Sequence, residues 1–154
     1  MKKAYLFDWG DTLMVNDHDM TGKMCDWPQV AAIAGARETL AELSQKAAIY
    51  VATSAVDSCE IEIQQAFERV GLSEYISGYF CKANLGAIKT DPDFLLLILT
   101  RLGKSAKNVA MVGDSMVKDI RPALSAGITP IWLTSETDVV AGVRKITHLQ
   151  QLVA

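Results

Sequence analysis

Residues 4–13 read AYLFDWGDTL, an apolar run followed by a polar turn. Consecutive apolar positions are typical of a strand that is buried on both faces of a parallel sheet. Asp8 stands where this strand would end. The same pattern recurs along the chain, and it predicts further strands at residues 48–52, 79–81, 109–112, 130–133 and, less regularly, 143–146.

Helical patterns fall between these apolar runs. Asp91 is interpreted as the N-cap of one helix, with Pro92 as its first residue and Gly103 at its end. Pro122 falls in the first turn of another helix, where proline is tolerated. Strands that alternate with helices over short connections predict an α/β doubly wound fold, and we expect one domain over residues 1–154. The expected helices lie at residues 36–47, 63–70, 92–102 and from near Asp119 onward.

Residues 14–35 do not fit this alternation. They show no regular period and contain Gly22 and Pro28, so we expect a long loop that acts as a flap, or minimal cap, over the carboxyl edge of the sheet. The methionines and tryptophans near this loop could line an adaptable substrate pocket or simply pack on the core. The tract Asn16-Asp17-His18-Asp19 is interpreted as a solvated loop in preference to a second metal site.

Composition excludes several classes of protein. Fifteen lysines and arginines against 18 aspartates and glutamates give a net charge of −3, which argues against a nucleic-acid-binding protein. The three cysteines have no paired spacing, which suits a reducing cytoplasm and offers no thiolate zinc site. The longest apolar run, residues 94–99, is far shorter than the ~20 residues of a membrane span. With only seven residues before Asp8, we expect no secretory leader and a cytoplasmic location.

Polar side chains gather where the predicted strands end. Asp8 and Asp11 follow the first strand, Thr53 and Ser54 follow the second, and Asp114 follows the fourth. In a doubly wound sheet, ligands bind at the carboxyl ends of the strands. Carboxylates, hydroxyls and a cation at one edge fit phosphoryl transfer to a carboxylate, in which a divalent cation and a lysine neutralise the phosphate oxygens. The other two members of this set are Lys89, just before a helix, and Asp119.

This arrangement resembles the haloacid dehalogenase superfamily, whose members are mostly phosphatases, and the resemblance covers nearly the whole chain. The superfamily's four motifs occur in order, at residues 8–13, at Thr53, at Lys89 and at residues 113–119. Any one of them alone would be a weak signal. Together they imply a Rossmann-like three-layer α/β/α sandwich with a mainly parallel sheet, in which the first strand is central.

The resemblance also implies a role for each site residue. Asp8 would be the nucleophile that forms an aspartyl-phosphate, and Lys89 would hold the phosphate. Mg²⁺ would be bound by Asp8, by Asp114 and by the backbone carbonyl of Gly10, which are the hard oxygen ligands that it prefers. The remaining expected roles are phosphate binding by Thr53 and Ser54 and a contact to the metal through water by Asp119.

Gly10 departs from the superfamily's pattern. Phosphatase members usually carry a second aspartate at this position, two residues after the nucleophile, as a general acid and base, which is typically worth about 10²–10⁴-fold in rate. Asp11 is a candidate substitute. In a continuing strand, however, its side chain would point to the face opposite Asp8. Only an early turn, which a glycine permits, would bring it to the same side.

The leading hypothesis is therefore a Mg²⁺-dependent phosphatase that acts on a small phosphorylated metabolite through Asp8. Two alternatives remain: a non-catalytic member that binds a phosphorylated ligand or a protein, and a 2-haloacid dehalogenase, which needs no proton for its leaving halide. Residues 14–35 are too few for an independent cap domain. We expect a site that is open or closed by this segment or by a second copy of the chain, so a homodimer also remains open.

Overall fold

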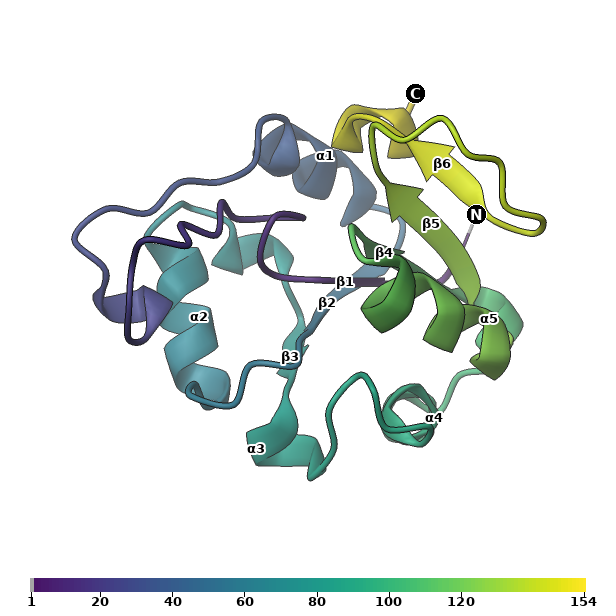
Figure 1. Cartoon of the computed structure of the whole chain (residues 1–154), viewed down its shortest axis with the longest axis horizontal. Coiled ribbons are helices and arrows are strands. Elements are labelled where there is room, and N and C mark those ends of the chain that lie inside the picture. Colours follow the sequence, from purple (N-terminus) through teal and green to yellow (C-terminus); the bar gives the residue numbers. More distant parts are fainter. Residues whose placement is uncertain (1) are drawn as a thin grey trace.

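Six parallel strands form the central sheet of the computed structural model, which describes residues 2–154 (Figure 1). β1 (Ala4–Phe7) is central and lies between β2 (Ala48–Ala52) and β4 (Val109–Gly113). The order β3-β2-β1-β4-β5-β6 confirms the predicted doubly wound fold with the first strand central. The other strands are β3 (Gly78–Phe80), β5 (Thr129–Leu133) and β6 (Arg144–Ile146), each within a residue of its prediction.

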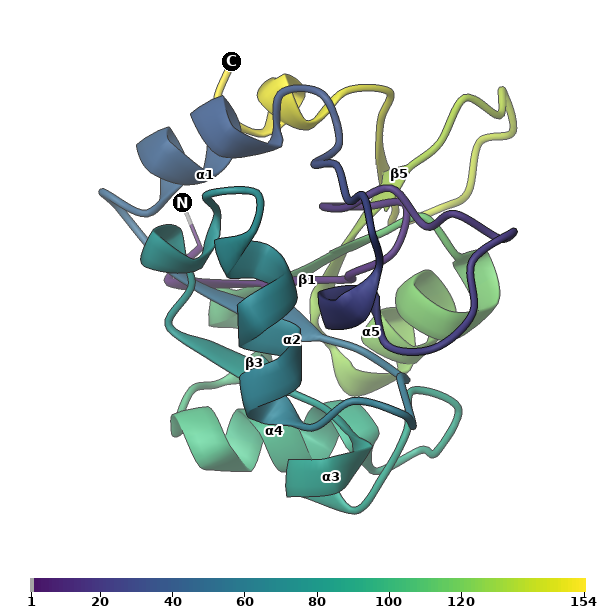
Figure 2. The same ribbon diagram turned by 90° about the vertical axis from the view of Figure 1, so that its left-hand side faces the viewer.

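Helices cover both faces of the sheet and give three layers (Figures 1 and 2). Tyr5 and Phe7 of β1 pack in one core cluster, which includes side chains of the helices α1 and α2. Ala4 and Leu6 pack in the other, with side chains of α4 and α5. Because both faces of β1 are buried, its four residues are apolar without alternation. The helix bounds are α1 (Ala36–Leu43), α2 (Glu60–Glu68), α3 (Lys82–Leu85), α4 (Phe94–Leu102) and α5 (Arg121–Ala126).

Three helix starts differ from the sequence prediction. α2 begins at Glu60, three residues before the expected residue 63. Asp91 does not cap α4, which begins at Phe94; its carboxylate instead accepts a hydrogen bond from the backbone N–H of Ile88 at 2.9 Å and closes a turn. The helix after β4 begins before Asp119, because a π-helical turn at Met116–Ile120 leads directly into α5. Short 3-10 turns at Met24–Asp26, Ser73–Tyr75, Ala106–Asn108 and Leu149–Leu152 complete the fold.

Within residues 2–154, every helix is too short or too polar to cross a membrane.

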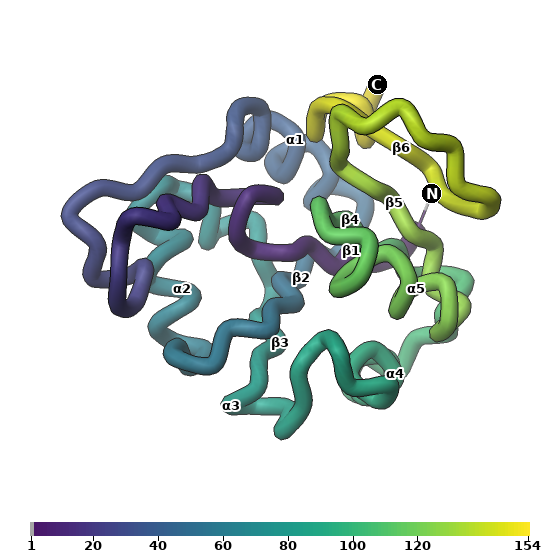
Figure 3. The backbone as a smooth tube through the Cα atoms, in the orientation of Figure 1, coloured from purple at the N-terminus to yellow at the C-terminus, as the bar shows by residue number. Residues whose placement is uncertain are grey.

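The 14–35 segment runs along one side of the sheet beside α2 (Figures 2 and 3). Met14 is fully buried, and Met24 and Trp27 are nearly so. The Arg69 guanidinium, just after α2, donates hydrogen bonds to the carbonyls of Trp27 at 2.6 Å and Cys25 at 3.2 Å. This segment is therefore packed on the core, although it has little regular structure.

Candidate active site

Two aspartates follow the two central strands of the sheet. Asp8 comes directly after β1, and its backbone N–H donates to the carbonyl of Val112 at 2.9 Å. Asp114 comes directly after the neighbouring strand, β4. The chain progresses from β1 toward β3 on one side and from β4 toward β6 on the other, so this is the point where the strand order reverses. Such a point opens a crevice at the carboxyl edge of the sheet.

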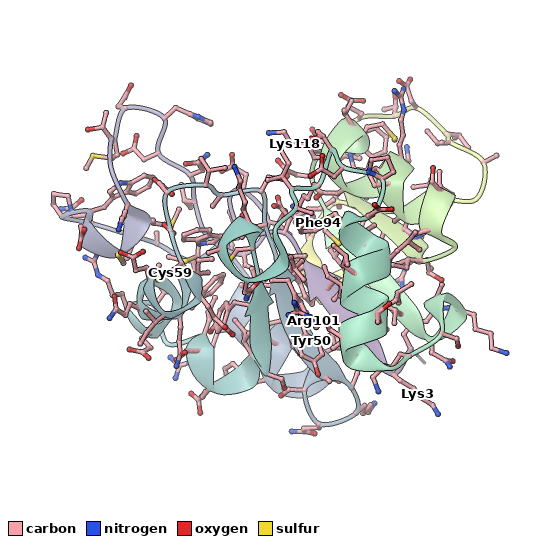
Figure 4. All side chains as sticks on the ribbon, turned by 90° about the horizontal axis from the view of Figure 1, so that it is seen from below. Lys3, Tyr50, Cys59, Phe94, Arg101 and Lys118 are labelled. Carbon is pink, nitrogen blue, oxygen red and sulfur yellow. The ribbon has the colours of Figure 1, made fainter. Side chains whose placement is uncertain are left out.

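The crevice is a cavity of about 470 Å³. In Figure 4, Lys118 on the cavity wall lies toward one edge of the molecule, whereas Lys3, just before β1, lies toward the opposite edge. All eight residues that the sequence predicted for the site line this cavity: Asp8, Gly10, Asp11, Thr53, Ser54, Lys89, Asp114 and Asp119. Their gathering in one place follows from the parallel sheet, because strand ends and the loops that follow them share one edge.

Lys89 is the buried cation of the cavity, with 3% of its side chain exposed. Its Nζ lies 2.5 Å from Asp8 Oδ1 and 2.6 Å from Asp119 Oδ1. Burial opposes the charge, but the two carboxylates outweigh it and raise the pKa of Lys89. Burial likewise opposes the charge on Asp8, yet Lys89 and hydrogen bonds lower the pKa of that carboxyl below its usual value. Asp8 is therefore held as a carboxylate, which is the form that can act as a nucleophile.

Asp119 is held by the loop that follows β4. The backbone N–H of Ser115 donates to its Oδ2 at 3.1 Å, and the π-helical turn carries its side chain back toward Lys89. Burial raises the pKa of Asp119 although Lys89 opposes this. Gly113 makes the arrangement possible, because a Cβ at this position would lie 2.2 Å from Asp119 Oδ2.

We expect the change Gly113→Ala to displace the Asp119 carboxylate and to destabilise the protein by about 1–3 kcal/mol, the usual cost of overpacking a filled interior. The clash is with a carboxylate that already bonds to both Lys89 and Ser115, so the side chain cannot move away without losing one of these bonds. Urea unfolding measures the change. Gly10→Ala is the matched control, since the atom nearest to its Cβ would be Asn16 Cβ, at 3.2 Å, which is a far milder contact. Equal stability of Gly113→Ala and the wild type would show that Asp119 is not packed against residue 113.

Asp114 is the exposed member of the carboxylate group. Its partial burial, together with its hydrogen bond to Asp8 and the charges of Asp8 and Asp119, raises its pKa to about 7. Thr12 ties the pair together: its hydroxyl donates to Asp8 Oδ2 at 3.1 Å and lies 3.5 Å from Asp114 Oδ1. Sequence analysis missed Thr12. The signal for Thr12 was a hydroxyl four residues after Asp8, in the turn that follows β1 and returns the chain toward Asp8.

The two hydroxyl residues after β2 have different partners. Thr53 is 5% exposed, and its hydroxyl accepts a hydrogen bond from the backbone N–H of Ala55 at 3.1 Å. The Ser54 hydroxyl accepts one from the backbone N–H of Lys89 at 3.0 Å. Ser54 therefore anchors the loop that carries Lys89, besides lining the cavity.

The chain turns immediately after β1, at Gly10 and Asp11. Asp11 has a φ of +61°, in the left-handed region, and its backbone N–H donates to the carbonyl of Met14 at 2.6 Å. Aspartate tolerates this conformation better than most residues. The strand does not continue, so Asp11 lies on the same cavity as Asp8 and not on the opposite face of the sheet. Its carboxylate is not one of the three that lie closest together.

The carboxylates form a donor set that suits a divalent cation. Asp8, Asp114 and Asp119 each place one oxygen within 4.8 Å of the others. Three carboxylates and the ammonium of Lys89 carry a formal charge of −2 when all are ionised, which a divalent cation would neutralise. Oxygen ligands of this kind suit Mg²⁺, so the residues present fit this metal.

Known proteins are similar to this chain in sequence and in fold. A family model for haloacid dehalogenase-like hydrolases matches residues 26–127, a range that includes Lys89, Asp114 and Asp119 but not Asp8. A phosphoserine phosphatase of Thermus thermophilus is 33% identical over 63 residues, which are 41% of this chain and 25% of that protein. The chain therefore spans about a quarter of the length of this curated relative.

Solved structures extend the likeness to the whole fold. A HAD-hydrolase of Bacillus subtilis solved with magnesium has a TM-score of 0.79 at 16% identity, over 98% of this chain and 96% of that one. A 2-haloacid dehalogenase of Pseudomonas syringae has a TM-score of 0.78 at 20% identity, over 99% and 97%. Because the family model matches well over half of the residues, the chain belongs to the haloacid dehalogenase-like hydrolases.

Proposed function

We propose that this protein is a Mg²⁺-dependent phosphatase that acts on a small phosphorylated substrate through an aspartyl-phosphate on Asp8. The observation that carries the proposal is the buried Lys89 ammonium, 2.5 Å from Asp8, beside a cluster of carboxylates that fits a divalent cation. The partial match to a phosphoserine phosphatase and the likeness to a hydrolase solved with magnesium support it.

The first step is attack by a carboxylate oxygen of Asp8 on phosphorus. A P–O bond to Asp8 forms while the P–O bond to the leaving group breaks, and the electron pair of that bond stays on the leaving oxygen. Lys89 offsets negative charge on the transferring group, as preorganised cations do in phosphoryl transfer. Thr12 holds the other Asp8 oxygen at 3.1 Å, which fixes the direction of the nucleophile.

The second step is hydrolysis of the aspartyl-phosphate. Water attacks phosphorus, the P–O bond to Asp8 breaks, and the carboxylate is restored as inorganic phosphate leaves. Mg²⁺, held by Asp8, Asp114 and the carbonyl of Gly10 with Asp119 nearby, would supply positive charge to the phosphate oxygens when bound. Thr53 and Ser54, which line the same cavity, are proposed to contribute hydrogen bonds to the phosphate.

The proposal is tested by phosphate release from p-nitrophenyl phosphate, acetyl phosphate and an alkyl phosphate, each with Mg²⁺ and with EDTA. We expect Mg²⁺-dependent turnover that is faster for the aryl and acyl phosphates, because Gly10 cannot protonate an alkoxide and good leaving groups need no proton. Chelation should abolish turnover of every substrate.

Two outcomes would contradict the proposal. If the protein is stabilised by orthovanadate with Mg²⁺ but turns over none of the phosphates, it is a binding protein. Halide release from 2-haloacids in the presence of EDTA would instead indicate a dehalogenase. The three adjacent carboxylates, which suit a divalent cation, favour the phosphatase over the dehalogenase.

A further inference from the structure

The missing acid at Gly10 raises the question of which other group in the cavity can give up a proton. The cavity wall includes one histidine, His18, which belongs to the 14–35 segment. Imidazole is the side chain that enzymes use most often for general acid and base catalysis. Sequence analysis placed His18 in a solvated loop. It is solvated, with 80% of the side chain exposed, but it also faces the cavity that contains Asp8.

His18 is paired with Asp11. Its Nε2 lies 3.7 Å from Asp11 Oδ2, while the other oxygen, Oδ1, accepts a hydrogen bond from the backbone N–H of Asn16 at 3.0 Å. Both oxygens of Asp11 therefore face groups of the chain, and this carboxylate is placed to orient an imidazole. Among residues 2–154 the contact of the His18 ring is the one from Nε2 to Asp11, which leaves the second ring nitrogen, Nδ1, for proton transfer.

The local backbone fixes this pair. Gly10 has no side chain, and the turn that follows it gives Asp11 its left-handed conformation and turns its carboxylate toward Asn16. A second turn holds His18, since the Asp17 carboxylate accepts from the backbone N–H of Asp19 at 3.0 Å and the Asp17 carbonyl accepts from that of Met20 at 3.1 Å. The turn at Gly10 and Asp11 ends the strand, and together with the turn that holds His18 it places Asp11 and His18 on the cavity wall.

We propose that His18 is the general acid of this protein, and that Asp11 is the residue that positions it. The inference rests on the proposed phosphatase function. As the P–O bond to the leaving group breaks, the leaving oxygen takes a proton from the His18 imidazolium. The neutral imidazole is then reprotonated from solvent, and the second step, in which water attacks the aspartyl-phosphate and keeps its proton on the departing phosphate, does not use His18. The alkyl-phosphate turnover of the protein depends on this residue, whereas turnover of aryl phosphates does not.

The test is the dependence of kcat on the leaving group in His18→Ala. We expect kcat for an alkyl phosphate to fall by about 10²-fold or more, the lower range for loss of a general acid. For p-nitrophenyl phosphate, whose leaving group needs no proton, kcat should stay within about threefold of wild type. Asp11→Asn should lower the alkyl rate in the same selective way but by less, because the imidazole remains. Asp19→Ala, in the same turn but away from the cavity wall, should leave both rates unchanged.

Placing an acid at residue 10, where related phosphatases usually carry an aspartate, gives an independent readout. Gly10→Asp in the His18→Ala background should recover alkyl-phosphate turnover, because a carboxyl two residues after Asp8 would again reach the leaving oxygen. The backbone φ at Gly10 is an ordinary one, and the new Cβ would meet Asn16 Cβ at 3.2 Å, so the side chain needs only a small adjustment.

The outcomes separate the two proposals. If the wild type hydrolyses no phosphate at all, the proposed function fails and this inference fails with it. If aryl phosphates are hydrolysed but His18→Ala changes aryl and alkyl rates equally, or changes neither, only the inference is overturned. It is also overturned if the wild type has no alkyl-phosphate turnover, or if Asp11→Asn loses that turnover while His18→Ala keeps it, since Asp11 would then be the acid.

Discussion

Asp8→Asn is expected to lose at least about 10⁴-fold in phosphate release, the scale seen when an enzyme loses its nucleophile. The amide has nearly the same shape as the carboxylate but cannot form an acyl phosphate, so every substrate should be affected regardless of its leaving group. The measurement is kcat for p-nitrophenyl phosphate with Mg²⁺. The fold should persist, because Lys89 keeps Asp119 as an ion-pair partner at 2.6 Å.

Asp57→Asn is the matched control for this prediction. Asp57 also lines the cavity but is not one of the three carboxylates that lie within 4.8 Å of one another, and the substitution removes the same charge. Its turnover should stay close to wild type. Mass spectrometry of rapidly quenched wild-type enzyme should also show one added phosphoryl group, which Asp8→Asn should lack. Undiminished turnover in Asp8→Asn would refute the assignment of Asp8 as the nucleophile.

The sheet and the position of its ligand-binding edge were predictable from sequence because they depend on simple burial. β1 and β4 are buried on both faces and are therefore apolar at every position, which distinguishes them from amphipathic segments. Once the strands are parallel, the residues that follow them must share one edge. Asp8, Thr53 and Asp114 come together for this reason, as their positions after the strands predicted.

The features that the sequence did not predict lie in turns, where one residue pattern is compatible with more than one local structure. Asp91 followed by Pro92 looks like a helix cap, yet the Asp91 carboxylate bonds to the backbone of Ile88, and α4 starts only at Phe94. Thr12 was passed over because a threonine in a turn has no distinctive pattern. Its role follows from contacts to Asp8 and Asp114, which lie at quite different places in the chain. His18 lay in a tract whose polarity indicated only exposure to solvent.

Lys89→Met is expected to lower both activity and stability, and to do so in a way that depends on Mg²⁺. Lys89 is 3% exposed and pairs with Asp8 and Asp119, so its removal leaves two adjacent carboxylates without their cation. Loss of one partner from a buried ion pair typically costs about 3–5 kcal/mol. Urea unfolding in EDTA should show this loss, and phosphate release should fall by about 10²-fold or more, as when a preorganised group that stabilises the transition state is removed.

Magnesium should partly reverse the stability loss while the activity stays low. Without Lys89 the formal charge of the site changes from −2 to −3, so the carboxylates attract a divalent cation more strongly, and a ligand that binds only the folded state stabilises it. Mg²⁺ should therefore raise the Tm of Lys89→Met by more than it raises the Tm of the wild type. Lys118→Met is the control, because Lys118 lines the same cavity but is exposed. If Lys89→Met in EDTA were as stable as Lys118→Met, the buried ion pairs would not contribute to the fold. If Mg²⁺ raised the Tm of Lys89→Met and the Tm of the wild type equally, the carboxylates would not form the metal site. Separating the two readouts matters because a merely misfolded variant would lose activity without gaining sensitivity to Mg²⁺.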